Sequence, residues 1–322
     1  MATERPDETF LPLSVAEKSE IARGIWRFRL KPAAGEKLPD YAPGSHITVV
    51  TPSGARRQYS LCGSGVDPDV WELAIKHEVD GRGASQSMVN DLAEGDLVQV
   101  SVPDNNFELI SSDEYLFIAG GIGITPILSM LRFLQQSGHD RFQLIYLTRD
   151  AEGTAFRDEL QSAPYAGRVI LHHDGGDPDQ AYDLWPHFES PGKSQVYCCG
   201  PRPLMEEVGD MTGHWRQGSI HFEDFASDVD AHRDHDHGFT VVNADSGERV
   251  EIPADATILE TLRSRGHEMR SSCESGTCGA CRLELVSGRA DHRDIVLEER
   301  DQNRYIMACV SRAADDELTL RW

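Results

Sequence analysis

Ser272-Cys273-Glu-Ser-Gly-Thr-Cys278-Gly-Ala-Cys281 is the stretch that most constrains the fold and chemistry of this chain. Its cysteines follow the pattern C-x4-C-x2-C, and a fourth, Cys309, comes later. This is the spacing of plant-type [2Fe-2S] centres, in which four thiolates hold two irons. Gly276 and Gly279 permit the tight backbone that such a loop requires and let N–H groups point at sulfur. We therefore expect the ligands of a [2Fe-2S] cluster to be Cys273, Cys278, Cys281 and Cys309.

Zinc is the alternative metal for four cysteines. Zinc sites usually carry two C-x2-C pairs, and the second pair is missing here. The chain has seven cysteines, an odd number, and it begins without the basic and apolar segments of a secretory signal. We therefore expect thiols and metal ligands in a reducing cytoplasm rather than disulfides.

Length and charge limit the remaining possibilities. The chain has 322 residues, enough for two or three domains with cores of their own. Its 31 basic and 54 acidic residues give a net charge of −23, which would repel a nucleic-acid backbone and favours basic protein partners. The apolar runs fall far short of the ~20 residues that a membrane-spanning helix needs. We expect a globular protein that binds neither nucleic acid nor membrane.

The first third of the chain is patterned as short strands. Clusters of Gly, Pro, Asp and Ser separate them at a spacing of roughly ten residues, which is typical of a β-sandwich or barrel. One helix is expected at residues 85–92. The expected strands are residues 25–30, 46–50, 58–62, 71–76 and 96–102.

Residues 114–221 change to alternating strands and helices, which is typical of a parallel sheet covered by helices. The expected strands are residues 115–119, 142–147, 168–173 and 195–199, and the expected helices are residues 126–135 and 156–162. Strands at 239–243 and 249–252 and a helix at 258–265 then lead to the cysteine loop.

The stretch between these regions, residues 226–237, is polar and acidic, and we interpret it as a linker. Its histidines, His232, His235 and His237, are a candidate metal site. A solvated linker with chance histidines is the simpler interpretation, because no rigid scaffold fixes their geometry.

Two segments of the α/β region are candidates for binding a nucleotide. Gly120-Gly-Ile-Gly-Ile-Thr-Pro126 lies between an expected strand and helix, where glycines let a pyrophosphate approach and a helix N-terminus attracts anions. Cys198-Cys199-Gly200-Pro201 ends an expected strand, at the edge where parallel sheets bind ligands. The alternatives are a glycine-rich turn without a ligand and a small buried thiol.

Two earlier segments are candidates for holding a phosphate. Arg57-Gln-Tyr-Ser-Leu61 offers an arginine for the phosphate and an aromatic side chain for a flat ring, although, without the later motifs, an ordinary strand with a half-buried Tyr59 is the preferred interpretation. Gly81-Arg-Gly-Ala-Ser85 precedes a short helix and offers N–H groups with Arg82 and Ser85.

Together with His221-Phe-Glu-Asp-Phe225, and in this order, these motifs resemble those of phthalate dioxygenase reductase and related reductases of Rieske oxygenases. The resemblance extends from about residue 12 to residue 322. It is strongest over residues 271–312, which include Ala290-Asp-His-Arg-Asp294 and Ile306-Met-Ala-Cys-Val-Ser-Arg312.

The resemblance implies a multidomain protein. Residues 1–110 are expected to form an antiparallel β-barrel flavin domain and residues 111–226 an α/β parallel-sheet NADH domain. After a linker at 227–237, residues 238–322 are expected to form an α+β plant-type ferredoxin domain. The implied cofactors are FMN, which the domain order favours over FAD, and a [2Fe-2S] cluster, with NADH as co-substrate.

The resemblance also implies the site residues. Arg57, Tyr59 and Ser60 would hold the flavin, Ala74, Ile75 and Lys76 would line the isoalloxazine, and Gly81, Arg82, Gly83 and Ser85 would complete the phosphate site. The nicotinamide nucleotide would bind at Gly121, Gly123, Thr125, Cys199 and Pro201, and Phe225 would pack near the flavin. Gln58 is expected to point away from the face that carries Tyr59. No catalytic acid or base is expected, because the cofactors carry the electrons.

The expected activity is that of an NADH-dependent oxidoreductase, the reductase component of an oxygenase system. Electrons would pass from NADH through FMN and the cluster to a separate terminal Rieske oxygenase, in the first instance a dioxygenase of phthalate or a similar aromatic acid. We expect a cytoplasmic monomer that meets the oxygenase in a transient complex. The alternatives are a reductase of a Rieske monooxygenase or demethylase, a ferredoxin-type electron carrier, and a zinc-binding interaction protein.

The choice of NADH over NADPH rests on the resemblance. An acidic residue after the second strand of such a sheet binds the ribose hydroxyl, whereas an arginine holds a 2′-phosphate. Asp150, Asp174 and Asp177 are the acidic candidates, but Arg149 stands beside Asp150.

Overall fold

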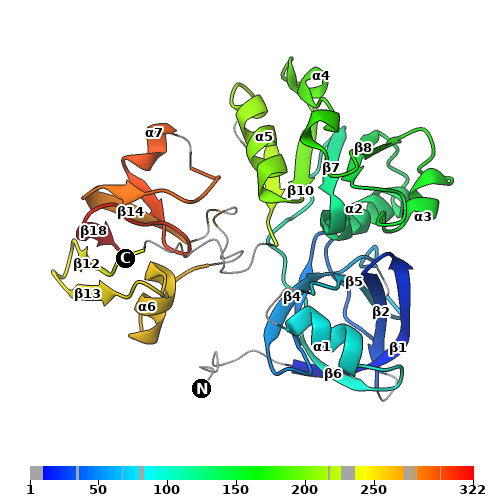
Figure 1. The fold of residues 1–322 in the computed structure, drawn as a ribbon, viewed down its shortest axis with the longest axis horizontal. Coiled ribbons are helices and arrows are strands. Elements are labelled where there is room, and N and C mark those ends of the chain that lie inside the picture. The colour runs from blue at the N-terminus through cyan, green and yellow to red at the C-terminus, as the bar shows by residue number, and fades with distance from the viewer. Residues whose placement is uncertain are drawn as a thin grey trace. The chain divides into compact units, whose positions relative to one another are not determined.

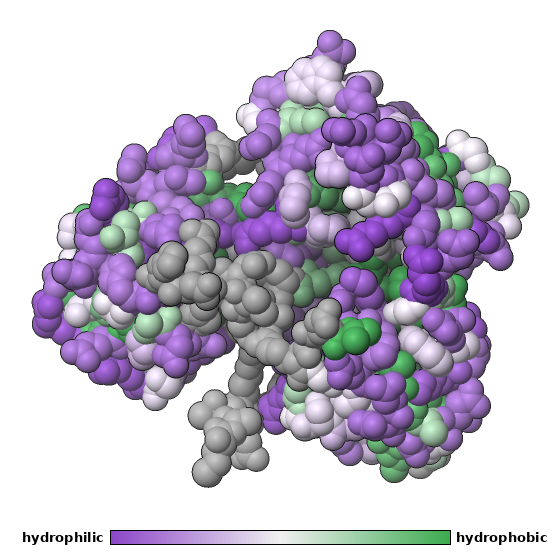
Figure 2. All heavy atoms as spheres, in the orientation of Figure 1, coloured by the Kyte–Doolittle hydropathy of each residue, from purple (hydrophilic) through white to green (hydrophobic). Residues whose placement is uncertain are grey.

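The computed structural model describes residues 10–33, 36–66, 68–79, 83–216, 218–225, 236–271, 276, 279, 281–297 and 299–322. They belong to two compact units, Met1–His221 and Phe222–Trp322, and many of their elements are labelled in Figure 1. No helix in the described part of the chain has the length and apolarity needed to cross a membrane. The visible faces of both units are mostly hydrophilic (Figure 2), in keeping with the high charge.

The first sheet of unit 1 is antiparallel and closes into a barrel. Its order is β4-β3-β6-β1-β2-β5. Closure comes just after β4, where Leu61 pairs with Leu73 of β5 and the Cys62 N–H donates to the carbonyl of Glu72 at 2.8 Å. The strands are β1 (Phe10–Ala22), β2 (Ile25–Pro32), β3 (His46–Val50), β4 (Arg56–Ser60), β5 (Trp71–Lys76) and β6 (Leu97–Ser101), and helix α1 is Ala84–Asp91.

Alternation of apolar and polar residues explains most of these strands. In β5 the side chains of Trp71, Leu73 and Ile75 are completely or almost completely buried in the barrel core. β1, which runs through the middle of the sheet, was not expected from the sequence. Two register shifts interrupt it, between Val15 and Glu17 and between Glu20 and Ala22, and such bulges break the alternation that identifies a strand.

The second sheet of unit 1 is parallel where β7, β8, β9 and β10 pair, and its order is β11-β10-β7-β8-β9. All six residues of β7 are buried, as expected for a strand covered on both faces. The strands are β7 (Tyr115–Gly120), β8 (Phe142–Thr148), β9 (Val169–His173), β10 (Gln195–Cys199) and β11 (Ile220–Glu223). The helical elements are η1 (Gly121–Gly123), α2 (Ile124–Gln136), α3 (Arg157–Gln161), η2 (Pro178–Gln180), α4 (Trp185–Phe188) and α5 (Arg202–Thr212).

The helices of this region differ from expectation in two places. Helix α2 begins at Ile124 rather than at residue 126, because Pro126 lies in the first turn, where a helix needs no N–H donor. Helix α5 was not expected; Pro201 is its N-cap and Pro203 is its second residue. Both prolines fall at or before the first turn, where they are compatible with a helix.

The barrel and the parallel sheet share one hydrophobic core. Ile25, Cys62 and Ala74 of the barrel are buried in the same cluster as Ile124 and Ile127 of α2. The two expected domains at 1–110 and 111–226 are therefore packed into one body up to His221. Burial of apolar surface at this junction opposes their separation.

Unit 2 contains a five-stranded sheet of order β13-β12-β18-β14-β16. Its helix α6 (Ile258–Ser264) starts with a capping box, in which Thr257 and Glu260 each accept a hydrogen bond from the other's backbone N–H. The strands are β12 (Phe239–Asn243), β13 (Arg249–Ile252), β14 (Arg282–Ser287), β15 (Ala290–Asp291), β16 (Tyr305–Met307), β17 (Arg312–Ala313) and β18 (Glu317–Arg321), and α7 is Glu299–Gln302.

Candidate cofactor sites

Two of the four expected cluster ligands lie together in unit 2. Cys281 immediately precedes β14 and Cys309 follows β16, and strand pairing between Arg282 and Met307 brings them side by side. Their Sγ atoms are 3.1 Å apart, and both residues are buried. Two sulfurs on one tetrahedral metal with bonds of ~2.3 Å would lie ~3.7 Å apart, so this pair suits a shared iron. Cys273 and Cys278 lie outside the described residues.

Gly276 packs against Val310, in the segment that carries Cys309, and against Asp294. Its φ is +81°, and a Cβ there would lie 2.7 Å from Val310 and 3.0 Å from the Cα of Asp294. The Gly276 carbonyl also accepts a hydrogen bond from the N–H of Ile295 at 3.1 Å. Both the backbone conformation and the space therefore require glycine, as the sequence analysis expected of a tight loop.

A buried carboxylate supports the segment that carries Cys309. It was not expected from the sequence. The side chain of Asp294 is 0% exposed. It accepts hydrogen bonds from the Ser311 hydroxyl at 3.1 Å and from the Leu297 N–H at 2.9 Å. Ser311 in turn accepts from the N–H of Arg293 at 3.2 Å. These bonds fix the chain just after Cys309, and no spacing rule in the sequence marks them.

The nucleotide candidates meet at the point where the parallel sheet reverses its strand order. The loop after β7 and the loop after β10 lie side by side there, at the carboxyl edge where such sheets bind ligands. A Cβ on Gly123 would lie 2.1 Å from the carbonyl oxygen of Cys199, and one on Gly120 would lie 2.6 Å from Pro201. Because Gly120 and Gly123 lack side chains, the two loops can come into contact. Thr125 is buried and closes the turn with a hydrogen bond to the Ile122 carbonyl at 3.1 Å.

The acidic candidates for the ribose all make local bonds. Asp150, after β8, accepts a hydrogen bond from the Gly153 N–H at 2.8 Å and pairs with Arg23 of the barrel, and these contacts lower its pKa. Asp174 accepts from Gly176 at 2.7 Å, and Asp177 caps η2. Each carboxylate therefore has a role in its own loop, and their contact with a nucleotide stays a prediction.

The flavin candidates lie on β4 and β5. Arg57 and Tyr59 are partly buried while Gln58 is exposed, so Gln58 lies on the opposite face of β4, as the alternation requires. Burial raises the pKa of Tyr59 to about 12, which keeps its hydroxyl protonated. The Ser60 hydroxyl is buried without a hydrogen-bond partner among the described residues. A buried polar group of this kind normally has a partner, so the site suits a polar ligand.

The remaining flavin candidates divide between two environments. Ala74 lies in the core shared with the nucleotide domain, whereas Ile75 points into the barrel core. Lys76 is exposed and pairs with Glu78 at 2.6 Å. Gly83, with φ +88°, is the N-cap of α1, and the Ser85 hydroxyl accepts a bond from the Glu78 N–H at 3.2 Å. The expected phosphate ligands Gly81 and Arg82 lie outside the described residues.

The aromatic segment at 221–225 ends the second sheet. The rings of His221 and Tyr197 stack with centroids 4.5 Å apart, and burial lowers the pKa of His221. Phe225 is 43% exposed, an unusual state for a phenylalanine. Its position against the flavin stays a prediction.

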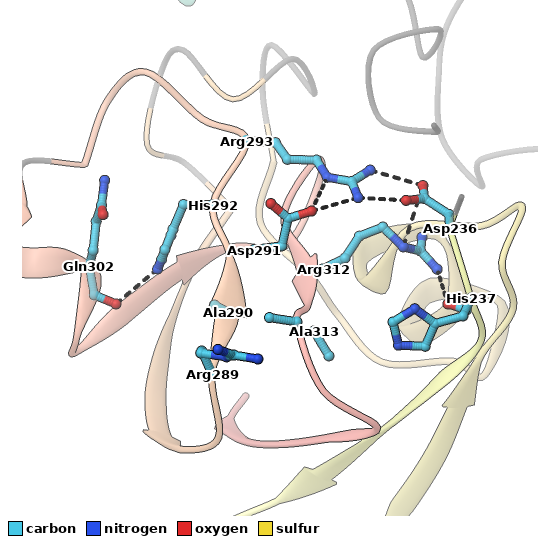
Figure 3. Close-up of a pocket in the computed structure, with 11 residues that line it drawn as sticks. Asp236, His237, Arg289, Ala290, Asp291, His292, Arg293, Gln302, Arg312 and Ala313 are labelled. Atoms are coloured by element: carbon cyan, nitrogen blue, oxygen red, sulfur yellow. Dashed lines mark hydrogen bonds and ion pairs between the residues drawn. The ribbon is translucent and has the colours of Figure 1, made fainter. Parts of the chain in front are cut away.

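A pocket of about 730 Å³ in unit 2 holds a buried ion-pair network (Figure 3). Arg293 forms two hydrogen bonds to Asp236, at 2.6 and 2.9 Å, and a third to Asp291 at 2.8 Å. Arg312 approaches Asp236 at 3.6 Å and donates to the carbonyl of His237 at 3.1 Å. The end of the expected linker, at Asp236 and His237, is thus attached to unit 2. Of its other histidines, His232 and His235 lie outside the described residues.

Replacing Asp236 by asparagine is expected to destabilise unit 2 by about 3 kcal/mol, since it removes the buried partner of Arg293 and leaves that buried charge with only the more exposed Asp291. Asp236 and Arg293 have side chains only 7% and 5% exposed. Thermal bleaching of the iron–sulfur absorption measures this loss. Asp315→Asn is the control, because the pair of Asp315 with Arg289 is exposed and contributes little. Equal effects of both variants would contradict the expectation.

Comparisons with known proteins assign three kinds of domain along the chain. Residues 12–109 match an oxidoreductase FAD-binding domain, residues 117–210 an oxidoreductase NAD-binding domain, and residues 241–314 a 2Fe-2S iron–sulfur cluster binding domain. The chain is 49% identical over 321 residues to the phthalate 4,5-dioxygenase oxygenase reductase subunit of Pseudomonas putida, covering 99% of both chains. It is 36% identical to the carnitine monooxygenase reductase subunit of Escherichia coli (strain K12), covering 98% of this chain and 99% of that one.

A solved structure of phthalate dioxygenase reductase, described as modular for electron transfer from pyridine nucleotides to [2Fe-2S], is also similar. It superposes with a TM-score of 0.71 at 47% identity and covers 97% of this chain and 98% of that one. The fold and these matches together define a flavin- and iron–sulfur-containing, NADH-dependent oxidoreductase.

The chain belongs to the phthalate dioxygenase reductase family. The expected three-part fold and the expected cofactors, FMN, NADH and a [2Fe-2S] cluster, are thereby confirmed. Its relatives are reductase subunits of oxygenase systems, which implies a terminal oxygenase as the electron acceptor.

Proposed function

We propose that this reductase serves a Rieske-type dioxygenase that acts on phthalate or a similar aromatic acid. The observation that carries the proposal is the identity of 49% over 99% of both chains to a reductase subunit named for phthalate 4,5-dioxygenase. The identity to the carnitine monooxygenase reductase subunit is 36% over a similar length. The second candidate is therefore service to a Rieske monooxygenase.

We propose the following roles for the chain. Arg57 and Tyr59 on β4 and the N-terminus of α1 bind the flavin and its phosphate, since they combine a cation, a protonated hydroxyl and helical N–H groups. Ala74 borders the ring. A flavin held there would supply the conversion of the hydride of NADH into single electrons for the cluster.

The nucleotide and cluster sites require two further sets of residues. We propose that Gly121, Gly123 and Thr125 with Cys199 and Pro201 hold the nicotinamide nucleotide at the strand reversal. Cys273 and Cys278 complete the iron ligands with the adjacent pair of Cys281 and Cys309. The protein itself orients the rings and excludes water, and no side chain is needed to move a proton.

The partner is a separate oxygenase, met as a transient complex by a monomeric reductase in the cytoplasm. The net charge of −23 supports an electrostatically guided encounter with a basic surface. Such an encounter should slow as salt screens the charges over a Debye length of ~10 Å at 0.1 M.

The test is NADH-driven turnover with purified oxygenase components. Anaerobic NADH should first bleach both the flavin and the iron–sulfur absorption. With the oxygenase of a phthalate dioxygenase system and phthalate, product formation is expected to be at least tenfold faster than with a carnitine oxygenase and carnitine. The phthalate rate should fall as salt is raised. A faster carnitine reaction would support the second candidate instead, and a protein that NADH does not bleach would refute both.

A further inference from the structure

Helix α2 connects the nucleotide loop to the flavin strands. Its first turn follows Gly123, and its middle faces the barrel. The Ser129 hydroxyl donates to the carbonyl of Gly63 at 2.7 Å, and Arg132, one turn later, donates to the carbonyl of Cys62 at 2.9 Å. These carbonyls belong to the two residues that follow Leu61 at the end of the β4 motif. The same helix therefore binds the backbone beside the proposed flavin site.

Arg132 also pairs with carboxylates from two different elements. Its Nη1 donates to Oε1 of Glu72 on β5 at 2.7 Å. Its Nε and Nη2 donate to the two carboxylate oxygens of Glu159 on α3, at 2.8 and 2.7 Å. Burial would lower the pKa of Arg132, but its bonds to Glu159 and Glu72 outweigh burial and raise it. The planar guanidinium of Arg132 on α2 thus bonds at the same time to β5 and α3. A lysine has no such planar set of N–H donors.

The backbone around this contact is held in a costly conformation. Phe156, the N-cap of α3, has φ +57° and is the one non-glycine residue with a positive φ in the described part of the chain. Its ring lies 5.6 Å from the Arg132 guanidinium. A bulky residue adopts this conformation only where its surroundings hold it. The start of the helix that carries Glu159 is therefore fixed beside Arg132.

We propose that Arg132 is a positioning residue for hydride transfer, because it sets the separation between the nucleotide loop and the flavin strands. This rests on the proposed assignment of those two sites. Glu72 stands two residues before Ala74 on β5, and Arg132 stands seven residues after Thr125 on α2. Reacting atoms must lie ~3–3.5 Å apart, so a shift of 1 Å slows the reaction about a hundredfold. A clamp between the two supporting elements controls that distance.

The main experiment compares Arg132→Met with Arg141→Met in the holoenzyme. Arg141 is exposed and pairs with Glu114 inside the nucleotide domain, so its loss removes an arginine without touching the barrel. In Arg132→Met, anaerobic reduction of the flavin by NADH is expected to slow tenfold to a hundredfold at saturating NADH. The NADH concentration at half-saturation should change less than threefold. The long-wavelength absorption of nicotinamide stacked on flavin should weaken. Arg141→Met should stay within twofold of the parent rate.

Arg132→Met leaves the carboxylates of Glu72 and Glu159 without their shared cation, and the variant could fail to fold for that reason. Two further variants keep the proposal testable in that case. Arg132→Met/Glu72→Gln removes one of the two negative charges, and Ser129→Ala removes only the bond to Gly63. Both should slow flavin reduction, Ser129→Ala by less. Arg132→Lys should recover thermal stability but not the rate of flavin reduction by NADH. Lysine restores the positive charge but lacks the planar guanidinium that bonds to several partners at once.

Amide hydrogen exchange gives a readout that does not depend on turnover. Exchange at residues 61–63 and 72–74 should speed up in every slowed variant. The proposal is overturned if the variants exchange faster there and lose stability yet reduce their flavin at the parent rate, since Arg132 would then only stabilise the fold. A parent protein that NADH does not reduce would instead refute the proposed function.

Discussion

Cys309→Ser is expected to remove the [2Fe-2S] cluster while leaving NADH oxidation by ferricyanide within about twofold of the parent protein. Cys309 is buried, and its Sγ lies 3.1 Å from that of Cys281. A serine oxygen is a harder and weaker ligand for iron than a thiolate. The matched FAD- and NAD-binding domains lie in unit 1, which has its own core, so their function should survive the loss.

Iron and acid-labile sulfide analysis, the visible spectrum and the two activities measure this outcome. Electron delivery to the terminal oxygenase should be abolished together with the iron. Cys198→Ala is the control for iron content, because Cys198 is a fully buried thiol on β10 and not an expected ligand. Iron retained at the parent level would contradict the ligand assignment. Loss of ferricyanide activity along with the iron would contradict the independence of the two units.

The sequence predicted well where one local rule governs the structure. Strands at His46–Val50, Trp71–Lys76 and Gln195–Cys199 lie where the pattern placed them, because burial of alternate or consecutive apolar residues determines them. The cysteine spacing and the glycines of the loops after β7 and β10 could also be interpreted from the sequence. Few residue types can bind a metal or allow two backbones to approach closely.

Failures of prediction follow from structure that the local pattern does not contain. β1 was missed because bulges interrupt its register. The contacts that position the sites were missed for a different reason. Arg132 and Glu72 are 60 residues apart, and Arg293 and Asp236 are 57 apart. No periodicity links such pairs, so they become visible only when the chain is folded.

The fold modifies the division into domains that the sequence predicted. The barrel and the nucleotide domain read as separate domains because their strand patterns differ. The fold joins them through Ile25, Cys62 and Ala74, which pack in the core of the nucleotide domain. A cysteine at position 62 gave no sign of this role, because a small buried thiol fits any core.

Gly123→Ala is expected to reduce the rate of flavin reduction by NADH at least a hundredfold. The added Cβ would lie 2.1 Å from the carbonyl oxygen of Cys199 and 2.8 Å from the backbone nitrogen of Gly200. Both are backbone atoms, so relief requires the two loops at the strand reversal to move apart. A displacement of about 1 Å there would misplace the nicotinamide and cost about two orders of magnitude in rate.

The control must destabilise α2 without entering the nucleotide site, and Gly138→Ala does so at the other end of the helix. Gly138 has φ +75° with no atom within 4 Å of a Cβ, so alanine there costs ~1–2 kcal/mol of backbone strain and no clash. Overpacking at Gly123 costs a similar ~1–3 kcal/mol. Matched losses of thermal stability should therefore accompany very different rates of reduction by NADH. Dithionite, which needs no nucleotide site, should reduce flavin and cluster in both variants. If both variants lost the same rate with NADH, stability alone would explain the effect, and the contact between Gly123 and Cys199 would have no role in placing the nucleotide.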